Sequence, residues 1–254
     1  MTDTSRSKIE EKELEFFEKY YDGTPCNKLG DKLRLERMIT SLKHLSKEKH
    51  FNNVLSIGCG DGEFEILFSK HTNHIHALDL SPKAIENANK KIKEKGISNV
   101  SFEAKSFFDL NLDQKYDLIT CIAFLHHVPE KELESFIKTA YDHLNPGGIF
   151  FSQDPNINGI LRSVGRVLIK EKYSELHSPD ERELVPNELA DTCKKIGFSE
   201  VKLHYLDFFL IPSIYLFPYK FTFMMPVFKF VDSVLSFSPI AHLSSGFSLL
   251  AKKK

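Results

Sequence analysis

Residues 54–66 read VLSIGCGDGEFEI, and this stretch decides the fold that the rest of the chain must fit. Its first four residues, Val54–Ile57, predict a short buried strand, and the glycine turn Gly58-Cys59-Gly60-Asp61-Gly62 follows directly. Apolar residues between Phe64 and Phe68 then predict a helix. Glycines let a backbone turn tightly and approach a ligand closely, while the first amides of the helix stay free to bind that ligand. The stretch therefore predicts a strand–turn–helix unit with a ligand site at the turn.

The same alternation of strand and helix continues along the chain. Ser81-Pro82 is typical of a helix start, because serine caps the first turn and proline fits the first helical position, and Gly96 is typical of a helix end. Alternation at this spacing indicates βαβ units with right-handed crossovers, and hence an α/β fold with a parallel sheet and helices on both faces. Further strands are expected over residues 75–80, 100–104, 116–122, 149–152, 201–205 and 247–251.

The composition excludes several classes of protein. The 254 residues include 34 Lys and Arg against 35 Asp and Glu, so a strongly basic nucleic-acid binder is excluded and no nucleic-acid partner is expected. Four widely spaced cysteines form no CxxC pair, which excludes a disulfide scaffold and a zinc ribbon. The polar first residues lack the apolar segment of a signal peptide, so we expect a cytoplasmic protein.

The kind of ligand at the glycine turn can be narrowed from two residues. Asp79 ends the next predicted strand, 19 residues after Gly60, and an acid at that position can accept both hydroxyls of a ribose. A dinucleotide site would have the pattern GxGxxG or GxGxxA. Here the third small position is occupied by Glu63, whose charge would oppose a pyrophosphate. The pattern GxGxG therefore favours a nucleoside ligand without phosphates.

Four segments in a fixed order carry a family resemblance: VLSIGCGDG (54–62), LDLSPKAIENA (78–88), KYDLITCIAFLHHV (115–128) and LNPGGIF (144–150). With them the chain resembles the class I S-adenosylmethionine (SAM)-dependent methyltransferases of the small-molecule group over roughly residues 50–155. The resemblance implies a Rossmann-like, seven-stranded, mostly parallel sheet with one antiparallel strand. We expect an N-terminal helical cap over 1–45, the core over 46–206, an apolar helical insertion over 207–245 and the last strand of the core over 246–254.

The resemblance also implies which residues hold SAM. The glycine turn would pass under its methionine part, Asp79 would hold the ribose, and Leu80 would lie against the adenine. Ser106 and Phe107 would meet the adenine edge, and Cys121 and Ile122 would lie near the sulfonium. The implied cofactor-binding set is thus Gly58, Cys59, Gly60, Gly62, Asp79, Leu80, Ser106, Phe107, Cys121 and Ile122.

Two serines depart from the family pattern. The family usually has an acid at the position of Ser56, for the amino group of SAM, and often one at the position of Ser106, for the adenine amine. Charge-assisted hydrogen bonds are roughly twice as strong as neutral ones. The departure predicts either weaker SAM binding or compensation by Asp61.

Candidate residues for the acceptor side lie after the fourth and fifth strands. A methyl on a sulfonium already has its leaving group, so a general base is optional. His126, His127 and His177 are candidate bases, with His127 proposed as catalytic and packing or helix-start bonding as the alternative. The proposed substrate residues are Tyr21, His126 and Asp154; Tyr21 belongs to a YD element that resembles a family segment folding over SAM, or else to an ordinary helix end.

No metal site is predicted from the sequence. His71, His74 and His76 lie close together along the chain, and His74 and His76 share one face of a predicted strand. However, no carboxylate or cysteine completes a ligand set with them. A solvated loop is the simpler interpretation of these three histidines.

The insertion contains 21 residues, Phe208–Phe228, with Lys220 as the one charge. That length could cross a bilayer, but three prolines oppose a continuous helix. Three uses stay open: a lid over an apolar pocket, peripheral membrane contact through 207–245 aided by the basic face Arg162, Arg166 and Lys170, or a homodimer interface.

The function predicted from these features is SAM-dependent methyl transfer to a small molecule, apolar or lipid-linked. Sugar, polyketide and quinone-like acceptors compete within that class. The alternative from another class is a non-catalytic SAM-binding or interaction protein, which the two serines support and the retained glycines and Asp79 oppose. A protein or RNA acceptor is not expected, because no target-reading module is present.

Overall fold

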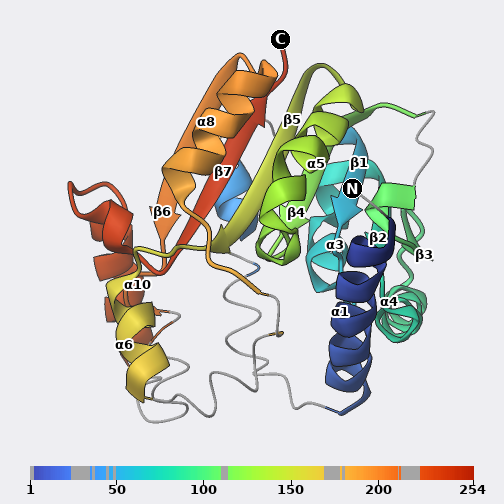
Figure 1. Ribbon diagram of the computed structural model, residues 1–254, viewed down its shortest axis with the longest axis horizontal. Coiled ribbons are helices and arrows are strands. Elements are labelled where there is room, and N and C mark those ends of the chain that lie inside the picture. The colour runs from blue at the N-terminus through green and yellow to red at the C-terminus, as the bar shows by residue number, and fades with distance from the viewer. Residues whose placement is uncertain are drawn as a thin grey trace.

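Seven strands form one sheet in the order β3-β2-β1-β4-β5-β7-β6 in the computed structural model (Figure 1). The structure describes residues 3–23, 35, 38–43, 46–47, 50–109, 114–168, 178, 181–210, 212 and 224–254. The strands are β1 (Phe51–Ile57), β2 (Thr72–Asp79), β3 (Val100–Ala104), β4 (Tyr116–Ile122), β5 (Leu144–Pro155), β6 (Glu200–Leu206) and β7 (Gly246–Lys252). Strands β1 to β5 pair in parallel, and β7 runs antiparallel to β5 and β6. The mostly parallel sheet with one antiparallel strand is confirmed.

The one large difference from the expected strands lies in β5. The sequence predicts a turn at Asn145–Gly148, whereas β5 already begins at Leu144. The pairing register between β4 and β5 shifts between Tyr116 and Leu118, so an irregularity in the ladder absorbs the proline and glycines without ending the strand. The strands predicted over 100–104 and 116–122 have the bounds of β3 and β4.

Helix α4 begins and ends where the sequence places its caps. Ser81 accepts a hydrogen bond from the Ala84 amide at the start of α4, and Gly96 ends that helix with a left-handed φ of 66°. The helices are α1 (Asp3–Gly23), α3 (Glu63–Phe68), α4 (Pro82–Lys95), α5 (Glu130–Asp142), α6 (Ile160–Leu168), α8 (Pro186–Ile196) and α10 (Met225–Leu235). Short 3-10 turns are η1 (Ser69–His71), η2 (Phe107–Asp109), η3 (Leu125–His127) and η5 (Ala241–Leu243).

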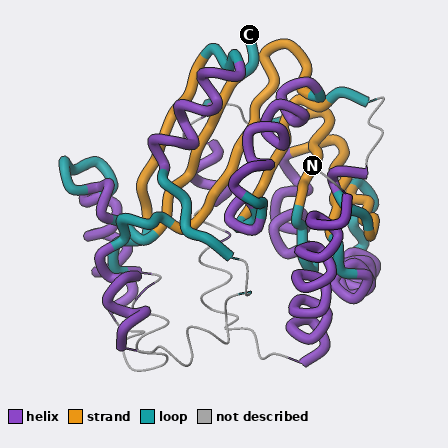
Figure 2. Tube along the Cα trace, viewed as in Figure 1, coloured by secondary structure: helices purple, strands orange, loops and turns teal. Residues whose placement is uncertain are grey.

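Helices cover both faces of the sheet, as expected (Figure 2). On one face, Phe136 of α5 and Leu189 of α8 join a core cluster with β1, β4 and β7. On the other face, Phe64 and Phe68 of α3 pack with Met38 against β1 and β2. A sheet buried on both faces explains why its strands read as nearly continuous apolar runs.

Helix α1 lies along α4 at the carboxyl ends of β1 and β2 (Figure 1). Glu18 fixes this position, because its Oε1 accepts hydrogen bonds from Ser81 Oγ at 2.5 Å and from the Lys83 amide at 3.0 Å. A carboxylate at a helix N-terminus is also favoured by the helix dipole. The first helix is therefore held over the edge of the sheet where the glycine turn lies.

The insertion leaves the sheet at β6 and returns to it at β7. These two strands pair along their whole length, from Glu200↔Lys252 to Leu206↔Gly246. Between them, the buried Asp232 of α10 accepts hydrogen bonds from the amides of Phe209 and Leu210, at 2.7 and 3.0 Å. Among the described residues, no helix has both the length and the apolar character needed to cross a membrane.

Candidate functional site

A cavity of about 1130 Å³ lies at the carboxyl ends of the parallel strands. It is bounded by α1, the glycine turn, the ends of β2, β4 and β5, and residues of α6. Chain connections diverge between β1 and β4, and ligands of open α/β sheets bind at such a switch point. Small-molecule pockets typically measure roughly 300–1,000 Å³, so this cavity lies just above the upper end of that range.

Asp79 anchors the glycine turn to the end of β2. Its Oδ2 accepts a hydrogen bond from the Gly60 amide at 2.7 Å, and its Oδ1 accepts one from the Ser81 amide at 3.0 Å. Burial raises the pKa of this carboxyl, and the two amide bonds act in the opposite direction. Asp79 lines the cavity together with Gly58, Cys59 and Gly60, so the predicted acid and the turn come together.

Tyr21 covers the glycine turn from above. A Cβ atom built on Gly60 would lie 2.3 Å from the Tyr21 hydroxyl oxygen, so a larger residue at 60 would push the tyrosine away. Burial, with Asp79 and Asp61 nearby, raises the pKa of Tyr21 well above its usual value and keeps it a neutral phenol. The structure thus places Tyr21, which the sequence assigns to the substrate, over the glycine turn and beside Asp79.

Gly62 is needed for packing, and it does not line the cavity. Its φ is 78°, and a Cβ on it would lie 2.6 Å from Cζ of Phe102 and 3.0 Å from Cβ of Ala88. Both neighbours belong to the layer between α4 and β3. The third glycine of the turn therefore lets α3 begin close to this layer and lies away from the cavity.

Replacing Gly62 by alanine is expected to lower the free energy of unfolding by roughly 2–4 kcal/mol. The alanine would have to adopt a left-handed backbone conformation, and its Cβ would overpack the layer between α4 and β3. Urea unfolding measures this change. Gly96→Ala is the matched control, because Gly96 has a similar φ of 66° and a Cβ added to it would meet nothing within 4 Å. The control should lose only about 1 kcal/mol. Equal losses for both variants would contradict a packing role for Gly62.

The other predicted cofactor residues divide into two groups. Leu80, Ser106, Phe107 and Ile122 line the cavity. Cys121 does not: it is fully buried in the core on the side of α5 and α8. Successive residues of a strand point to opposite faces, so Cys121 and Ile122 could not both face the ligand.

Each of the two unusual serines is bonded to a glutamate from elsewhere in the chain. Ser56 Oγ donates to Oε1 of Glu65 at 2.5 Å, and Ser106 Oγ donates to Oε1 of Glu10 at 2.7 Å. Asp61, the expected compensating acid, is instead paired with Lys91 Nζ at 2.5 Å. Carboxylates are thus present beside both serines, but they come from α3 and α1.

Glu65 is buried at 1% exposure and lines the cavity. Burial raises its pKa to about 7, with the Ser56 hydrogen bond acting in the opposite direction. Its Oε2 makes no hydrogen bond to any residue that the structure describes. One feature of the sequence could have indicated this residue. Glu65 stands between apolar residues of a helix that packs on the sheet, where a charge is unusual.

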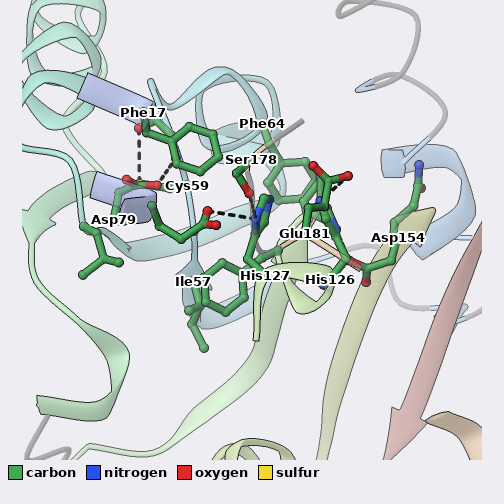
Figure 3. A pocket seen from close by; sticks show the side chains of 18 of the residues that line it. Phe17, Ile57, Cys59, Phe64, Asp79, His126, His127, Asp154, Ser178 and Glu181 are labelled. Carbon is green, nitrogen blue, oxygen red and sulfur yellow. Dashed lines mark hydrogen bonds and ion pairs between the residues drawn. The ribbon is translucent and has the colours of Figure 1, made fainter. Parts of the chain in front are cut away.

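Three acids and a serine lie close to the histidines after β4, and Figure 3 shows Asp154, Glu181 and Ser178 among them. His126 Nδ1 lies 2.9 Å from Asp154 Oδ1, and its Nε2 lies 3.7 Å from Glu181 Oε1. His127 Nδ1 lies 3.0 Å from Glu13 Oε2 and 3.2 Å from Ser178 Oγ. Burial raises the pKa of Asp154 to about 7, opposed by the bond from the His126 amide.

The structure therefore brings His126, His127 and Asp154 together in the cavity wall, while His177 lies outside the described residues. Glu13, Ser178 and Glu181 were missed from the sequence. They come from α1 and from the segment before α8, whose Arg182 amide donates to the His126 carbonyl at 3.1 Å. No motif spacing marks such residues, because tertiary contacts alone bring them to η3.

The three histidines that lie close together along the chain, His71, His74 and His76, each contact a different residue. His71 Nε2 lies 2.9 Å from Lys43 Nζ, His74 Nε2 lies 3.5 Å from Ser101 Oγ, and His76 Nε2 lies 3.2 Å from Glu103 Oε2. Each ring therefore has its own neighbour.

The predicted basic face of α6 is largely neutralised. Arg162 and Arg166 both pair with Glu183, at 2.7 and 3.1 Å, and Lys170 lies outside the described residues. The same helix exposes Val167 at 80% and Leu168 at 70%. Helix α10 exposes Phe230, and Phe237 after it is exposed as well.

Comparison with known proteins agrees with this site. Residues 54–148 match the family model of the methyltransferase domain. Residues 54–148 therefore form a methyltransferase domain, and solved structures with the same fold hold S-adenosylhomocysteine (SAH), so the chain is similar to the class I SAM-dependent methyltransferases. A structure with the same fold is magnesium protoporphyrin IX methyltransferase from Synechocystis PCC 6803 with bound SAH. It shares 14% identity over 99% of both chains, with a TM-score of 0.63.

Two curated relatives are named ubiquinone biosynthesis O-methyltransferase. The one from Rickettsia felis is 28% identical over 156 residues, which are 56% of this chain and 60% of the relative. The one from Pasteurella multocida is 28% identical over 183 residues, which are 65% of this chain and 72% of the relative. The chain thus matches less than two thirds of the length of the first relative.

Proposed function

We propose that this protein transfers the methyl group of SAM to an oxygen atom of a small molecule that carries an apolar portion. The proposal rests on one cavity whose two ends are lined by different kinds of residue. One end holds the glycine turn and Asp79, and the other is lined by Leu161 and Gly165 of α6 and by Pro212 of the insertion. The choice of oxygen is supported by the name of the curated relatives.

The residues of the first end fit SAM by their chemistry. Asp79 offers carboxylate oxygens to the ribose, and Leu80 and Phe107 offer apolar surface to the adenine. Glu65 has a buried oxygen without a hydrogen bond to any described residue, which suits the ammonium of the methionine part. Glu10 stands beside Ser106 to receive the adenine amine. The cofactor supplies a methyl carbon on a sulfonium, while the protein supplies position and electrostatics.

The second end fits an apolar acceptor. Phe16, Phe17 and Tyr20 of α1 and Phe64 of α3 extend the wall between the two ends. Such a wall excludes water from the methyl group and favours the transfer of an acceptor out of solution, at roughly 25 cal/mol per Å² of apolar surface buried. Helix α10 does not line the cavity, so among the described residues only the margins of the insertion reach the acceptor.

Release of SAH in the presence of simple acceptors tests this function. Phenols and catechols are compared with and without an alkyl tail of a few carbons. Because each buried methylene contributes about 0.8 kcal/mol, the tailed compounds should have at least about tenfold lower KM. Equal KM values would contradict the apolar end of the site. SAM binding without turnover of any acceptor would favour the non-catalytic alternative.

We further propose that the exposed apolar side chains of α6 and α10 contact a membrane surface from which the acceptor is taken. Val167, Leu168, Phe230 and Phe237 are each at least 70% exposed, and large exposed apolar surface marks an interaction site. Since Glu181 and Glu183 together balance the charges of Arg162 and Arg166, this contact is expected to depend on apolar burial more than on charge.

The double variant Phe230→Ser, Phe237→Ser is expected to bind lipid vesicles at least about tenfold more weakly, because two aromatic side chains no longer leave water. Co-sedimentation with vesicles at low and moderate salt measures this. Lys229→Ser on the same helix is the control and should change little. A variant that loses dimerisation in solution while vesicle binding stays equal would show that the surface joins two copies of the chain.

A further inference from the structure

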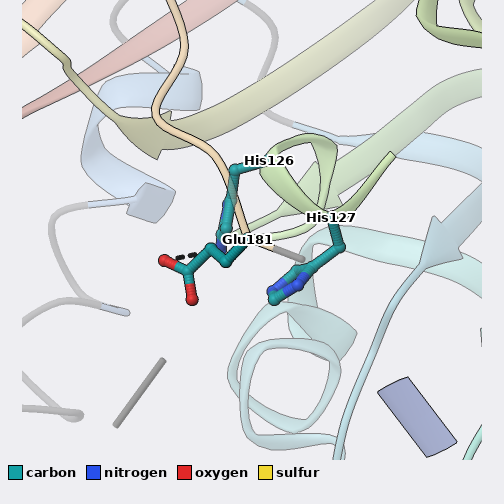
Figure 4. Close-up of side chains that lie close together, drawn as sticks. All are labelled: His126, His127 and Glu181. Carbon is teal, nitrogen blue, oxygen red and sulfur yellow. Dashed lines mark ion pairs between the residues drawn. The ribbon is translucent and has the colours of Figure 1, made fainter. Parts of the chain in front are cut away.

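Two histidines and a glutamate come together in the cavity wall, just after the carboxyl end of β4 (Figure 4). His126 and His127 lie on η3, and Glu181 lies on the segment before α8. One ligand atom of each residue lies within 4.8 Å of the others. The side chains of His126 and Glu181 are 6% and 10% exposed. Three such donors are the number that a catalytic zinc site usually takes from its protein.

Asp154 lies where it can hold His126 in the tautomer that a metal ligand needs. Its fully buried Oδ1 lies 2.9 Å from Nδ1 of His126. When Nδ1–H donates to this carboxylate, the ring keeps its lone pair on Nε2, the nitrogen that faces Glu181. Histidines that bind metals almost always donate their other ring N–H to a carboxylate, carbonyl or water.

Glu13 places a further buried carboxylate beside His127. It is 5% exposed, and among the described residues neither carboxylate oxygen has a hydrogen-bond partner, although Oε2 lies 3.0 Å from His127 Nδ1. Buried carboxylates are costly unless a cation or donors compensate them. An ion within reach of His127 would supply that compensation.

The charges around the two histidines are mostly negative. Three buried or nearly buried carboxylates surround them, from Glu13, Asp154 and Glu181. Among the described residues, Arg162 lies near Glu181, with Nη2 at 3.7 Å from Oε1, and it also pairs with Glu183 at 2.7 Å. Arg182, on the same segment as Glu181, is a second cation, attracted by Glu130 and by Asp154. Both arginines are shared with acids outside this group, so the three carboxylates around the histidines still favour an added positive charge.

We propose that His126, His127 and Glu181 bind one divalent transition-metal ion, with Asp154 as the positioning residue behind His126. Two imidazoles and one carboxylate suit zinc and its first-row neighbours, whereas magnesium and calcium prefer oxygen ligands alone. Three protein ligands leave a coordination position open toward the cavity. This inference goes against the sequence expectation, because the ligands come from segments more than 50 residues apart.

The binding of this ion does not depend on the methyl transfer proposed above. The role proposed for the ion in the reaction does. The open position would receive the acceptor oxygen, since a divalent ion lowers the pKa of a hydroxyl bound to it. The hydroxyl proton passes to the Glu13 carboxylate. The oxygen electron pair then forms the bond to the methyl carbon, while the carbon–sulfur bond breaks and its electrons stay on sulfur. The products are the methyl ether and neutral-sulfur SAH.

Titration of chelator-treated protein with zinc chloride tests the proposal, with calorimetry and metal analysis as readouts. Cobalt(II) is the second probe, because its visible spectrum reports nitrogen and oxygen ligands. One equivalent of zinc should bind. Glu181→Gln and His126→Ala should each weaken it at least about tenfold, and Asp154→Asn by about 10- to 100-fold. His76→Ala is the matched control, since His76 also lies beside a glutamate, at 3.2 Å, and should leave binding unchanged.

Three results would overturn the site: no bound zinc, zinc binding that survives Glu181→Gln, or equal loss in His76→Ala. Glu181→Gln keeps the proposal testable if His126→Ala fails to fold, because the amide has almost the same shape as the carboxylate. SAM titration of the same samples separates this proposal from the proposed function. Protein that binds SAM and turns over without metal would keep methyl transfer and leave His126 with Asp154 as a general base.

Discussion

Asp79→Ala is expected to weaken the binding of SAM and SAH by at least about 100-fold, which corresponds to about 2.7 kcal/mol. The carboxylate holds the glycine turn through the Gly60 amide, and we propose that it also accepts hydrogen bonds from the ribose of SAM. Hydrogen bonds to charged groups contribute roughly 1.5–3 kcal/mol each, so losing two accounts for the effect. Titration calorimetry at pH 8 measures it.

Two controls separate ligand contact from loss of the turn. Asp79→Asn keeps an acceptor for the Gly60 amide and should bind SAM with intermediate affinity. Asp142→Ala removes an exposed carboxylate that pairs with Lys138 at 2.6 Å, and should bind SAM like the unchanged protein. Full affinity in Asp79→Ala, with circular dichroism showing a folded protein, would remove Asp79 from the site.

Glu65→Gln is expected to weaken SAM binding by about 10- to 100-fold at pH 8 and to abolish its pH dependence, because a charge-assisted bond becomes a neutral one. The pKa of Glu65 is raised to about 7 by burial. Only the ionised carboxylate attracts an ammonium, so in the unchanged protein affinity should fall up to about tenfold per pH unit below pH 7. Calorimetry at pH 6, 7 and 8 measures both proteins.

The same variant should change the stability of the ligand-free protein in the opposite direction. An acid whose pKa is raised on folding keeps its proton longer in the folded state. The free energy of unfolding therefore decreases as pH rises from about 4.5, the unfolded value, to about 7. Glutamine carries no such cost, so Glu65→Gln should be more stable than the unchanged protein at pH 8 in urea unfolding. A variant that is less stable and binds SAM normally would show that Glu65 is only structural.

The parts of the fold that depend on local chemistry could be predicted from the sequence. Ser81 and Gly96 mark the ends of α4 because caps act within a few residues, and the alternation of strands and helices indicates the parallel sheet. The predicted start of β5 was wrong because where this strand begins depends on pairing with a distant strand and not on local chemistry. Asn145–Gly148 has the composition of a turn, but the pairing with β4 keeps it in the strand.

The same division holds within the site. The glycine turn and Asp79 belong to one local unit and one sheet edge, so their meeting follows from the order of the strands. Glu10 and Glu13 reach the cavity only because α1 docks over it, and Glu181 arrives with the segment bonded to η3. Contacts between distant segments leave no spacing in the sequence. This explains why Asp61 was expected to supply the missing charge, whereas the carboxylates beside Ser56 and Ser106 are those of Glu65 and Glu10.

Titration of the purified protein with SAM, SAH and NAD tests the central claim most directly. The glycine turn with Glu63 beside it, and Asp79 at the end of β2, predict that SAM and SAH each bind at one site per chain and that NAD does not bind. Binding of NAD, or no binding of either SAM or SAH, would contradict the assignment of this cavity to SAM.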